Sequence, residues 1–188
     1  MYNNWELIET NNVNDYEKFV KRFHYTKTVA RGCNRIFLLK IDGKKAGVAM
    51  YGHPVGTNVK KKYGNSTIEL KRFCLSNGCI KNTASWFIAK TIKLLPKGTK
   101  IISYADQNQG HEGTIYKASN FKYLGETKRT QYGKIHGVRG EIHLRNCYQK
   151  QTGKNTYTKT ALNFQKLMKQ GKASLRYKKP KHIFMYEV

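Results

Sequence analysis

The chain has 188 residues, of which 36 are Lys or Arg and 11 are Asp or Glu, so its formal net charge at pH 7 is +25. Hydrophobic residues make up 39% of it and aromatic residues 12%, which is enough for a sizeable core and excludes wholesale disorder. No apolar run reaches the length of a membrane span, and a charge this high favours polyanionic partners through counterion release.

The first half of the chain predicts one helix and then strands. Residues 14–23 begin with capping residues and place aromatic side chains at helical spacing. Asp42-Gly43 is a dipeptide typical of a tight hairpin between two strands. Residues 52–66 are rich in Gly, Lys and Asn, and we expect a mobile basic loop there. Strands are predicted at residues 36–41, 46–51 and 67–75.

The second half alternates helices and strands. A helix is predicted from about Asn82 to Leu95, with Asn82 as its N-cap and Pro96 just past its end. A second, short helix over 114–119 stops at Asn120, because Asn tolerates the left-handed conformation. The other predicted elements are strands at 101–105, 121–124 and 183–186 and a basic hairpin over 127–145.

This order of elements indicates the α/β class, with a mixed (α+β) sheet and helices on its faces. We expect residues 1–145 to form one catalytic domain and residues 146–188 a basic C-terminal extension that packs on the same domain. The extension contains ten Lys or Arg residues and a single acidic residue, Glu187.

The start of the chain, MYNNWELIET, lacks the basic region and apolar stretch of a secretory signal. The cysteines form no CxxC pair and no spacing typical of zinc ligands. We therefore expect a cytoplasmic protein with reduced thiols and no metal site made by these cysteines, which are Cys33, Cys74, Cys79 and Cys147.

Two charged residues, one within a predicted strand and one just after another, are candidates for chemistry. Asp106 follows the strand at 101–105, and catalytic groups commonly lie at that end of a strand. It could equally cap a helix or a turn. Arg72 lies in the middle of a strand, where a charge is costly unless it is paired or meets an anion. It could pair with Asp106, hold a carboxylate or phosphate of a donor, or point to solvent.

The segment from ELKRFCL to NFKYLGE resembles the central strand–helix–strand–helix of the GNAT acyltransferase fold. The resemblance implies that donor phosphates bind at the start of the helix, where free N–H groups favour an anion. The family's Gly-rich loop is replaced here by Gly78 and IKNTAS. The donor-binding candidates are Gly78, Asn82, Thr83 and Ser85; Ser85 could instead support the cap.

In the same segment, GTIYKASNF resembles the Tyr-x-x-x-Gly-Phe element of GNAT enzymes, with Asn120 in the Gly position. The resemblance implies that Tyr116 protonates a departing thiolate. The alternative is a Tyr whose ring packs in the core while its hydroxyl meets water.

Residues 24–145 also resemble the phage Mom-like proteins. The matching pieces are His24-Tyr25, ELKRF, NTASWF, SYADQNQGHEGTIYKASNF and GEIHLRN. The resemblance implies an enzyme that adds a carbamoylmethyl group to adenine N6 in phage DNA and so blocks restriction, in the host cytoplasm if the chain is phage-encoded.

An adenine amine is barely basic, so a base must take its proton as the new bond forms, and Asp106 is our candidate. The other catalytic candidates are Tyr116, Arg72 and Ser85. The target adenine must also leave the duplex, and aromatic and basic side chains must hold it. The expected contacts to double-stranded DNA are His24, Tyr25, Tyr104, His143, Arg145, Lys178, Lys179 and Lys181.

The donor is left open. Ordinary acyl transfer joins an amine to a carbonyl carbon, whereas a carbamoylmethyl product joins N6 to a methylene carbon. Acyl-CoA, a glycine-derived group carried on a tRNA, and an added metal or radical step are the alternatives. Two other functions also stay open: an N-acyltransferase acting on another amine, and a non-catalytic basic protein that binds nucleic acid.

Overall fold

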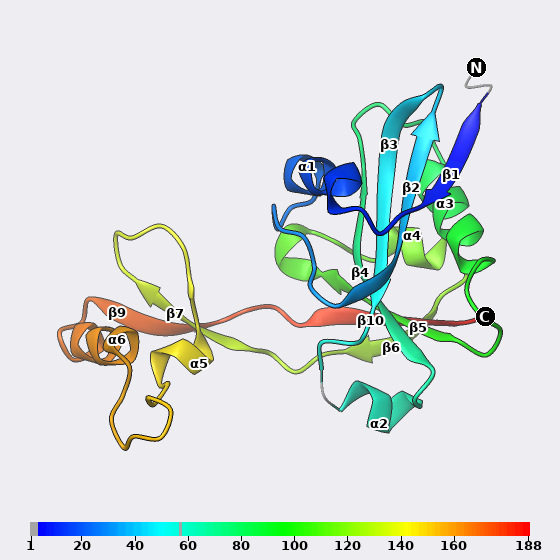
Figure 1. The fold of residues 1–188 in the computed structure, drawn as a ribbon. Coiled ribbons are helices and arrows are strands. Elements are labelled where there is room, and N and C mark those ends of the chain that lie inside the picture. The colour runs from blue at the N-terminus through cyan, green and yellow to red at the C-terminus, as the bar shows by residue number, and fades with distance from the viewer. Residues whose placement is uncertain (1–3, 57) are drawn as a thin grey trace. The chain divides into compact units, whose positions relative to one another are not determined.

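The computed structural model describes residues 4–56 and 58–188 and contains two compact units (Figure 1). The first unit comprises the chain up to Glu126 together with His182–Val188, and the second comprises Thr127–Lys181. The domain boundary expected at residue 145 falls inside the second unit, within the helix α5 (Leu144–Cys147). Among the described residues, no helix combines the length and apolar character needed to cross a membrane.

The first unit is built on a seven-stranded mixed sheet with the order β1-β2-β3-β4-β5-β10-β6. The pairs β1–β2, β2–β3 and β3–β4 are antiparallel, whereas β4 and β5 run parallel. The C-terminal strand β10 lies between β5 and β6 and pairs antiparallel with β6. The strands are β1 (Trp5–Glu9), β2 (Cys33–Ile41), β3 (Lys44–Gly52), β4 (Thr67–Leu75), β5 (Lys100–Asp106), β6 (Lys122–Glu126) and β10 (Lys181–Glu187).

Helices cover both faces of this sheet because β2 and β3 are apolar on both faces. Ile36 and Leu38 pack with Val20 of α1, while the alternate residues Phe37 and Leu39 belong to the core cluster that contains α3 and α4. Helix α1 therefore lies on one face, and α3 and α4 lie on the other (Figure 1). The helices are α1 (Val13–Phe23), α2 (Val59–Tyr63), α3 (Thr83–Ile92) and α4 (Thr114–Lys117).

The neighbouring strands β4 and β5 pair over only part of their length. Thr67–Glu69 pair with Lys100–Ile102, and within the described residues 67–106 the two strands do not pair beyond that point. On its other side β4 pairs with β3 through an irregularity, since Met50 lies opposite Arg72 and Tyr51 opposite Leu70. This bulge bends β4, and the sheet opens between the later halves of β4 and β5.

The second unit is a three-stranded sheet with two helices. The strand order is β8-β7-β9, with all pairs antiparallel. Its core consists of Cys147, Phe164 and Ala173. Gly133 of β7 makes this core dense, because a Cβ there would lie 2.6 Å from both the Cys147 and the Phe164 side chains. The elements are β7 (Gln131–Ile135), β8 (Ile142–His143), α5, α6 (Lys159–Lys169) and β9 (Ala173–Tyr177).

The mixed sheet and the hairpin expected over 127–145 are confirmed. Two local expectations need correction. The loop expected over 52–66 contains the helix α2. Asn82 is at the N-cap of α3 in a left-handed conformation, with φ of 67°, and its side chain makes no capping hydrogen bond. The sequence patterns also missed the strands β1 and β9.

Candidate functional site

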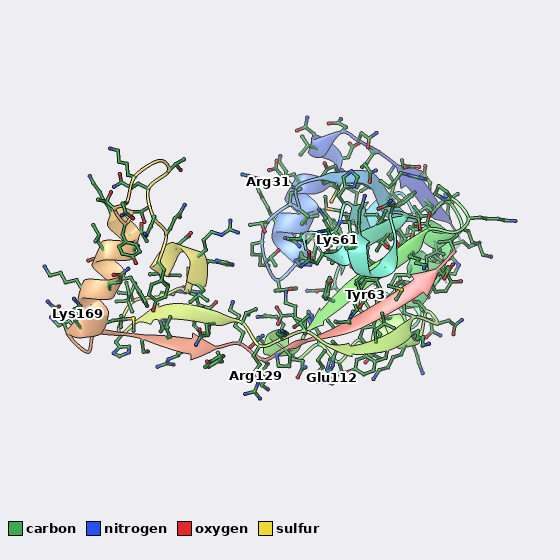
Figure 2. All side chains as sticks on the ribbon, turned by 90° about the horizontal axis from the view of Figure 1, so that it is seen from below. Arg31, Lys61, Tyr63, Glu112, Arg129 and Lys169 are labelled. Carbon is green, nitrogen blue, oxygen red and sulfur yellow. The ribbon has the colours of Figure 1, made fainter. Side chains whose placement is uncertain are left out.

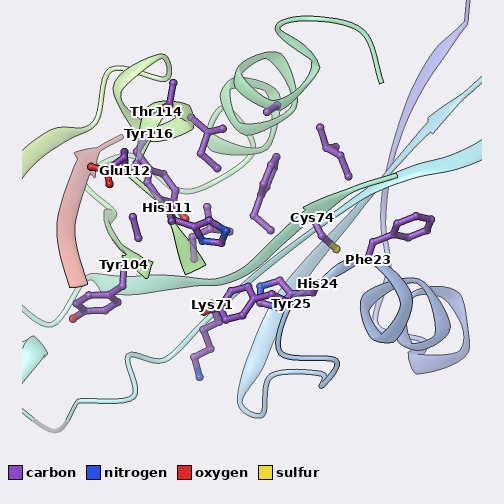
Figure 3. Close-up of a pocket in the computed structure, with 18 residues that line it drawn as sticks. Phe23, His24, Tyr25, Lys71, Cys74, Tyr104, His111, Glu112, Thr114 and Tyr116 are labelled. Atoms are coloured by element: carbon purple, nitrogen blue, oxygen red, sulfur yellow. The ribbon is translucent and has the colours of Figure 1, made fainter. Parts of the chain in front are cut away.

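A cavity of about 500 Å³ opens in the first unit where β4 and β5 part (Figure 3). Its volume lies in the range of ordinary small-molecule sites. Its wall is made by the later half of β4, by the residues that follow α1, by the end of β5 and by the segment 110–116. Four residues expected to be functional lie in this wall: His24, Tyr25, Tyr104 and Tyr116.

His24 is a buried, neutral imidazole at the end of α1. Its side chain accepts a hydrogen bond from the backbone N–H of Thr26, with Nδ1 and N 3.2 Å apart. Because a backbone N–H can only donate, Nδ1 carries no proton, and the ring holds its proton on Nε2. Burial, then the nearby Arg72 guanidinium and His111, lower the pKa of His24 to about 4. The cavity therefore presents an uncharged ring with an N–H group.

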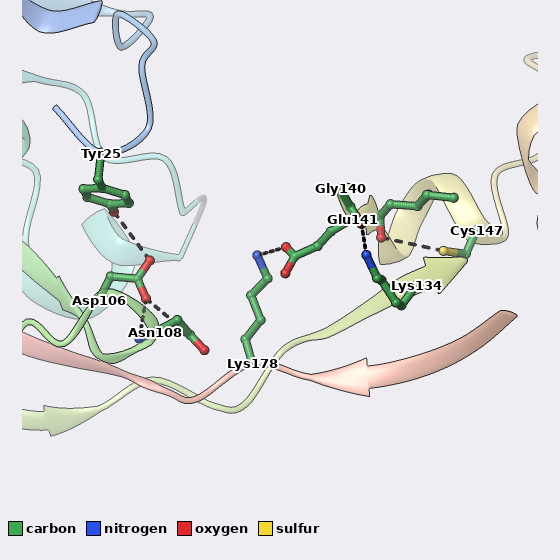
Figure 4. A network of polar contacts seen from close by, with 9 residues as sticks. Tyr25, Asp106, Asn108, Lys134, Gly140, Glu141, Cys147 and Lys178 are labelled. Carbon is green, nitrogen blue, oxygen red and sulfur yellow. Dashed lines mark hydrogen bonds and ion pairs between the residues drawn. The ribbon is translucent and has the colours of Figure 1, made fainter. Parts of the chain in front are cut away.

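Tyr25 connects the cavity to Asp106. Its ring stacks on His24 with 4.5 Å between centroids and meets His111 edge-on at 5.3 Å. Its hydroxyl donates a long hydrogen bond of 3.5 Å to Oδ2 of Asp106 (Figure 4). Burial, followed by the charge of Asp106, raises the pKa of the Tyr25 hydroxyl, which stays protonated at neutral pH.

Asp106 is the last residue of β5, and its two carboxylate oxygens make different contacts. Its Oδ1 accepts hydrogen bonds from the backbone N and the side-chain Nδ2 of Asn108, at 3.0 and 2.9 Å. It thereby caps the short 3-10 helix Gln107–Gln109. Its other oxygen, Oδ2, faces the Tyr25 hydroxyl. One oxygen thus belongs to the cap, and the other contacts a side chain of the cavity wall.

Two further phenols in the cavity wall hold their protons. Burial raises the pKa of Tyr116 to about 12, and its hydroxyl shares a hydrogen bond with Ser103. Burial and then the charge of Glu69 raise the pKa of Tyr104 to about 12. Both groups are protonated at neutral pH, so both can donate a hydrogen bond or a proton to a bound molecule.

Arg72 fastens the segment that carries His24 and Tyr25 to the sheet. Its Nε donates to the carbonyl oxygen of Thr28 at 3.1 Å, and its Nη1 donates to the carbonyl oxygen of Lys71 at 2.7 Å. Its charge acts on both His24 and Tyr25. The structure therefore places Arg72 beside the cavity wall and bound to backbone carbonyls.

The donor-binding candidates surround the start of α3, and this segment reaches the cavity wall through Ala84. The hydroxyl of Thr83 donates to the carbonyl oxygen of Ile80 at 2.7 Å. The hydroxyl of Ser85 donates to the carbonyl oxygen of Asn82 at 3.1 Å. Gly78 adopts a left-handed conformation with φ of 87°. Both hydroxyls are thus engaged within the turn that begins the helix.

Sequence reasoning missed four polar residues of the cavity wall, which are Lys71, His111, Glu112 and Thr114. Lys71 is at the bulge of β4 and donates through Nζ to the carbonyl oxygen of Arg31 at 2.7 Å. His111 and Glu112 belong to the QGHEG run that carried the family resemblance, so that run was the available signal. Within residues 4–56 and 58–188, no three His, Cys, Asp or Glu side chains converge as a metal site would require.

The remaining expected DNA contacts lie in the second unit. His143 accepts a hydrogen bond from the backbone N of Arg145 at 3.2 Å and caps α5. Lys178 pairs with Glu141 at 2.5 Å (Figure 4). Lys179 is exposed, and Lys181 is the first residue of β10. The unit as a whole has 15 Lys or Arg residues and one acidic residue, so its net charge is +14.

The fold is that of the GNAT acetyltransferases. An aminoglycoside acetyltransferase solved with coenzyme A aligns with a TM-score of 0.51 and 10% identity, over 66% of this chain and 87% of that one. The ribosomal-protein-S18-alanine N-acetyltransferase of Escherichia coli aligns with a TM-score of 0.51 and 12% identity, over 98% and 93% of the two chains.

Within this fold class, the chain belongs to the Mom protein family, which matches residues 7–185. A curated relative, the methylcarbamoylase Mom of Escherichia phage Mu, is 32% identical over 95 residues. The matched region covers 46% of this chain and 39% of the phage Mu protein, so the chain matches about two fifths of that relative's length.

Proposed function

We propose that this protein is a DNA-modifying transferase that adds a small acyl or carbamoylmethyl-type group to adenine N6 in double-stranded DNA and so protects the DNA from restriction, in the cytoplasm of a phage's host. One observation carries the proposal: in a chain of the Mom family, an aromatic cavity lies at the parting of β4 and β5, and Tyr25 links it to Asp106.

The cavity wall suits an extruded base. Enzymes that act on a base in duplex DNA take it out of the stack and hold it by stacking and by hydrogen bonds to its edge. The rings of Tyr25, His24 and His111 supply flat surfaces for stacking. Neutral His24 and protonated Tyr104 supply hydrogen-bond donors for the acceptor nitrogens of adenine.

The same residues supply the proton transfers. As N6 attacks the electrophilic carbon of the donor, the N6–carbon bond forms and the donor's leaving group departs with the electron pair of the broken bond. Asp106 takes the proton that N6 loses, through the Tyr25 hydroxyl. Tyr116, whose hydroxyl is protonated at neutral pH, gives a proton to the leaving group.

The donor belongs at the start of α3. The first N–H groups of a helix have no partner within the helix, and they favour an anion such as a phosphate. Ala84 brings this turn to the cavity wall, and Thr83 and Ser85 hold its shape. Either an acyl-CoA or a glycine-derived group on a tRNA would present phosphates to these N–H groups.

Nucleoside mass spectrometry of DNA from cells that express the protein tests this function. We expect deoxyadenosine that carries the added mass of a carbamoylmethyl group, and none in cells with the empty vector. Unmodified DNA from cells that contain folded protein would contradict the proposal.

The fold of an acetyltransferase solved with coenzyme A supports a second candidate, an N-acyltransferase for a protein or small-molecule amine. Saturable binding of acetyl-CoA with turnover on a free amine, and no modified nucleoside, would favour that candidate instead.

A further inference from the structure

The second unit, residues 127–181, has an exposed sheet face that the proposed chemistry does not use. Gly133 of β7 lies opposite Ile142 of β8 and Leu175 of β9, on the face that Cys147 and Phe164 cover. Side chains alternate along a strand, so the neighbours of these residues project from the other face.

A row of three side chains crosses this other face. His143, Tyr132 and Arg176 lie directly opposite one another on β8, β7 and β9. His143 and Arg176 are exposed, and Tyr132 is half-buried. Lys178 extends the row, since its Nζ lies 5.3 Å from the centre of the Tyr132 ring. We call these four residues the sheet row.

The charges of the unit are complementary to a polyanion. Residues 127–181 are under a third of the chain but carry +14 of its net charge of +25. Glu141, the single acidic residue among them, is neutralised by Lys178. Cationic side chains extend over the unit, as Figure 2 shows for Arg129 and for Lys169 on α6. The charge therefore does not by itself indicate which face of the unit binds.

The sheet row matches the major groove of DNA in size and chemistry. The major groove is about 12 Å wide and admits a two-stranded β-ribbon, and the paired strands β7 and β9, about 4.8 Å apart, carry Tyr132 and Arg176 of the row. The Arg176 guanidinium can bind a phosphate or a guanine edge with paired hydrogen bonds. Tyr132 and His143 add hydrogen-bonding groups beside it.

We propose that the sheet row is the surface by which this protein docks on double-stranded DNA, and that the second unit is its DNA-binding module. The choice of DNA as partner rests on the proposed function. The module anchors the duplex, and the cavity of the first unit receives the base.

The test compares two charge reversals in the full chain, Arg176→Glu on the sheet row and Lys166→Glu on α6. Both variants change the net charge equally. Lys166 is exposed and lies on the helix that packs against the other face of the sheet, so only Arg176→Glu alters the sheet row. Fluorescence anisotropy with an unmodified duplex measures binding.

We expect Arg176→Glu to weaken binding by about tenfold or more. It should also lower the slope of log affinity against log salt by about 0.9 for each phosphate that the variant no longer neutralises. Lys166→Glu should leave this slope unchanged.

Equal weakening by the two reversals would overturn the proposal, because binding would then follow net charge alone. Tighter binding to single-stranded RNA than to the duplex, with the same dependence on Arg176, would also overturn it. The variant Arg176→Gln, at the same exposed position, removes the charge without reversing it and should weaken duplex binding as well, and it covers the case in which Arg176→Glu does not fold.

Nucleoside mass spectrometry of the wild-type protein separates this proposal from the function. Duplex binding that depends on Arg176, without a modified nucleoside, leaves the docking surface standing and contradicts the chemistry. A modified nucleoside made by a protein whose duplex binding does not depend on Arg176 supports the proposed chemistry and contradicts the docking surface.

Discussion

His24 shows how a single buried residue couples the cavity to pH. It is 7% exposed, and burial together with Arg72 and His111 lowers its pKa from 6.5 to about 4. The unfolded chain therefore binds a proton at His24 more readily than the folded chain does. The contribution of His24 to the free energy of unfolding is therefore fully present above pH 6.5 and is lost as the pH falls towards 4.

We expect His24→Asn to remove this part of the pH dependence. Asn retains an acceptor for the N–H of Thr26 but does not titrate. Between about pH 7 and about pH 4.5 the wild-type free energy of unfolding should fall by up to about 3 kcal/mol more than that of the variant. Urea denaturation across this range measures the difference. Parallel curves for the two proteins would show that His24 titrates normally in the folded state.

At the scale of elements, the turn before α4 depends on a glycine. Gly113 has a φ of 73°, and a Cβ there would lie 2.2 Å from the ring of Phe184, a fully buried residue of β10. This close approach lets β10 pack against the helix that carries Tyr116, whose ring lies 5.3 Å from that of Phe184. Gly113 therefore helps to form the cavity wall.

We expect Gly113→Ala to be more destabilising than Gly110→Ala. Both glycines are left-handed, but a Cβ at Gly110 would meet nothing within 4 Å. Each variant costs about 1–2 kcal/mol of backbone strain, and Gly113→Ala adds about 1–3 kcal/mol for the clash with Phe184. Chemical denaturation of both proteins measures the difference, and equal losses would show that Phe184 moves away without cost.

The elements were predictable where side-chain periodicity is strong. Residues 67–75 alternate clearly, and the predicted strand has the same bounds as β4. The strand β9 was missed because its sequence ASLRY begins a dense basic run, and only its pairing with β7 fixes it. Asn82 was assigned as a capping side chain from its type, but its left-handed backbone prevents that geometry, which no sequence pattern reveals.

At the scale of the whole molecule, the second unit could not be recognised from sequence. Its small core joins Cys147, Phe164 and Ala173, which are separated by long polar and basic stretches. It extends from Thr127 to Lys181, because the chain leaves the first sheet after β6 and returns to it in β10. The contact between Tyr25 and Asp106 joins residues 81 positions apart, and only the family resemblance pointed to both.

The net charge of +25 leads to a prediction for the whole chain. We expect binding to double-stranded DNA to be tight at low salt and to weaken steeply as salt rises, because each neutralised phosphate contributes about −0.9 to the log–log slope. An anisotropy titration at several salt concentrations measures this slope. A slope shallower than that of about two phosphate contacts would contradict the polyanion partner.

The amount of modified deoxyadenosine formed by Asp106→Asn, compared with wild type, tests the central claim most directly. Asn keeps the acceptor oxygen that caps Gln107–Gln109, but it lacks the basic carboxylate that the proton from N6 requires. Asp42→Asn is the matched control, because it makes the same change in a hairpin turn whose left-handed conformation Asn tolerates. We predict that folded, DNA-binding Asp106→Asn protein loses about 10²–10⁴ in modification rate, while Asp42→Asn modifies DNA like the wild type. Near-wild-type modification by Asp106→Asn would contradict the account and leave Asp106 as a capping residue.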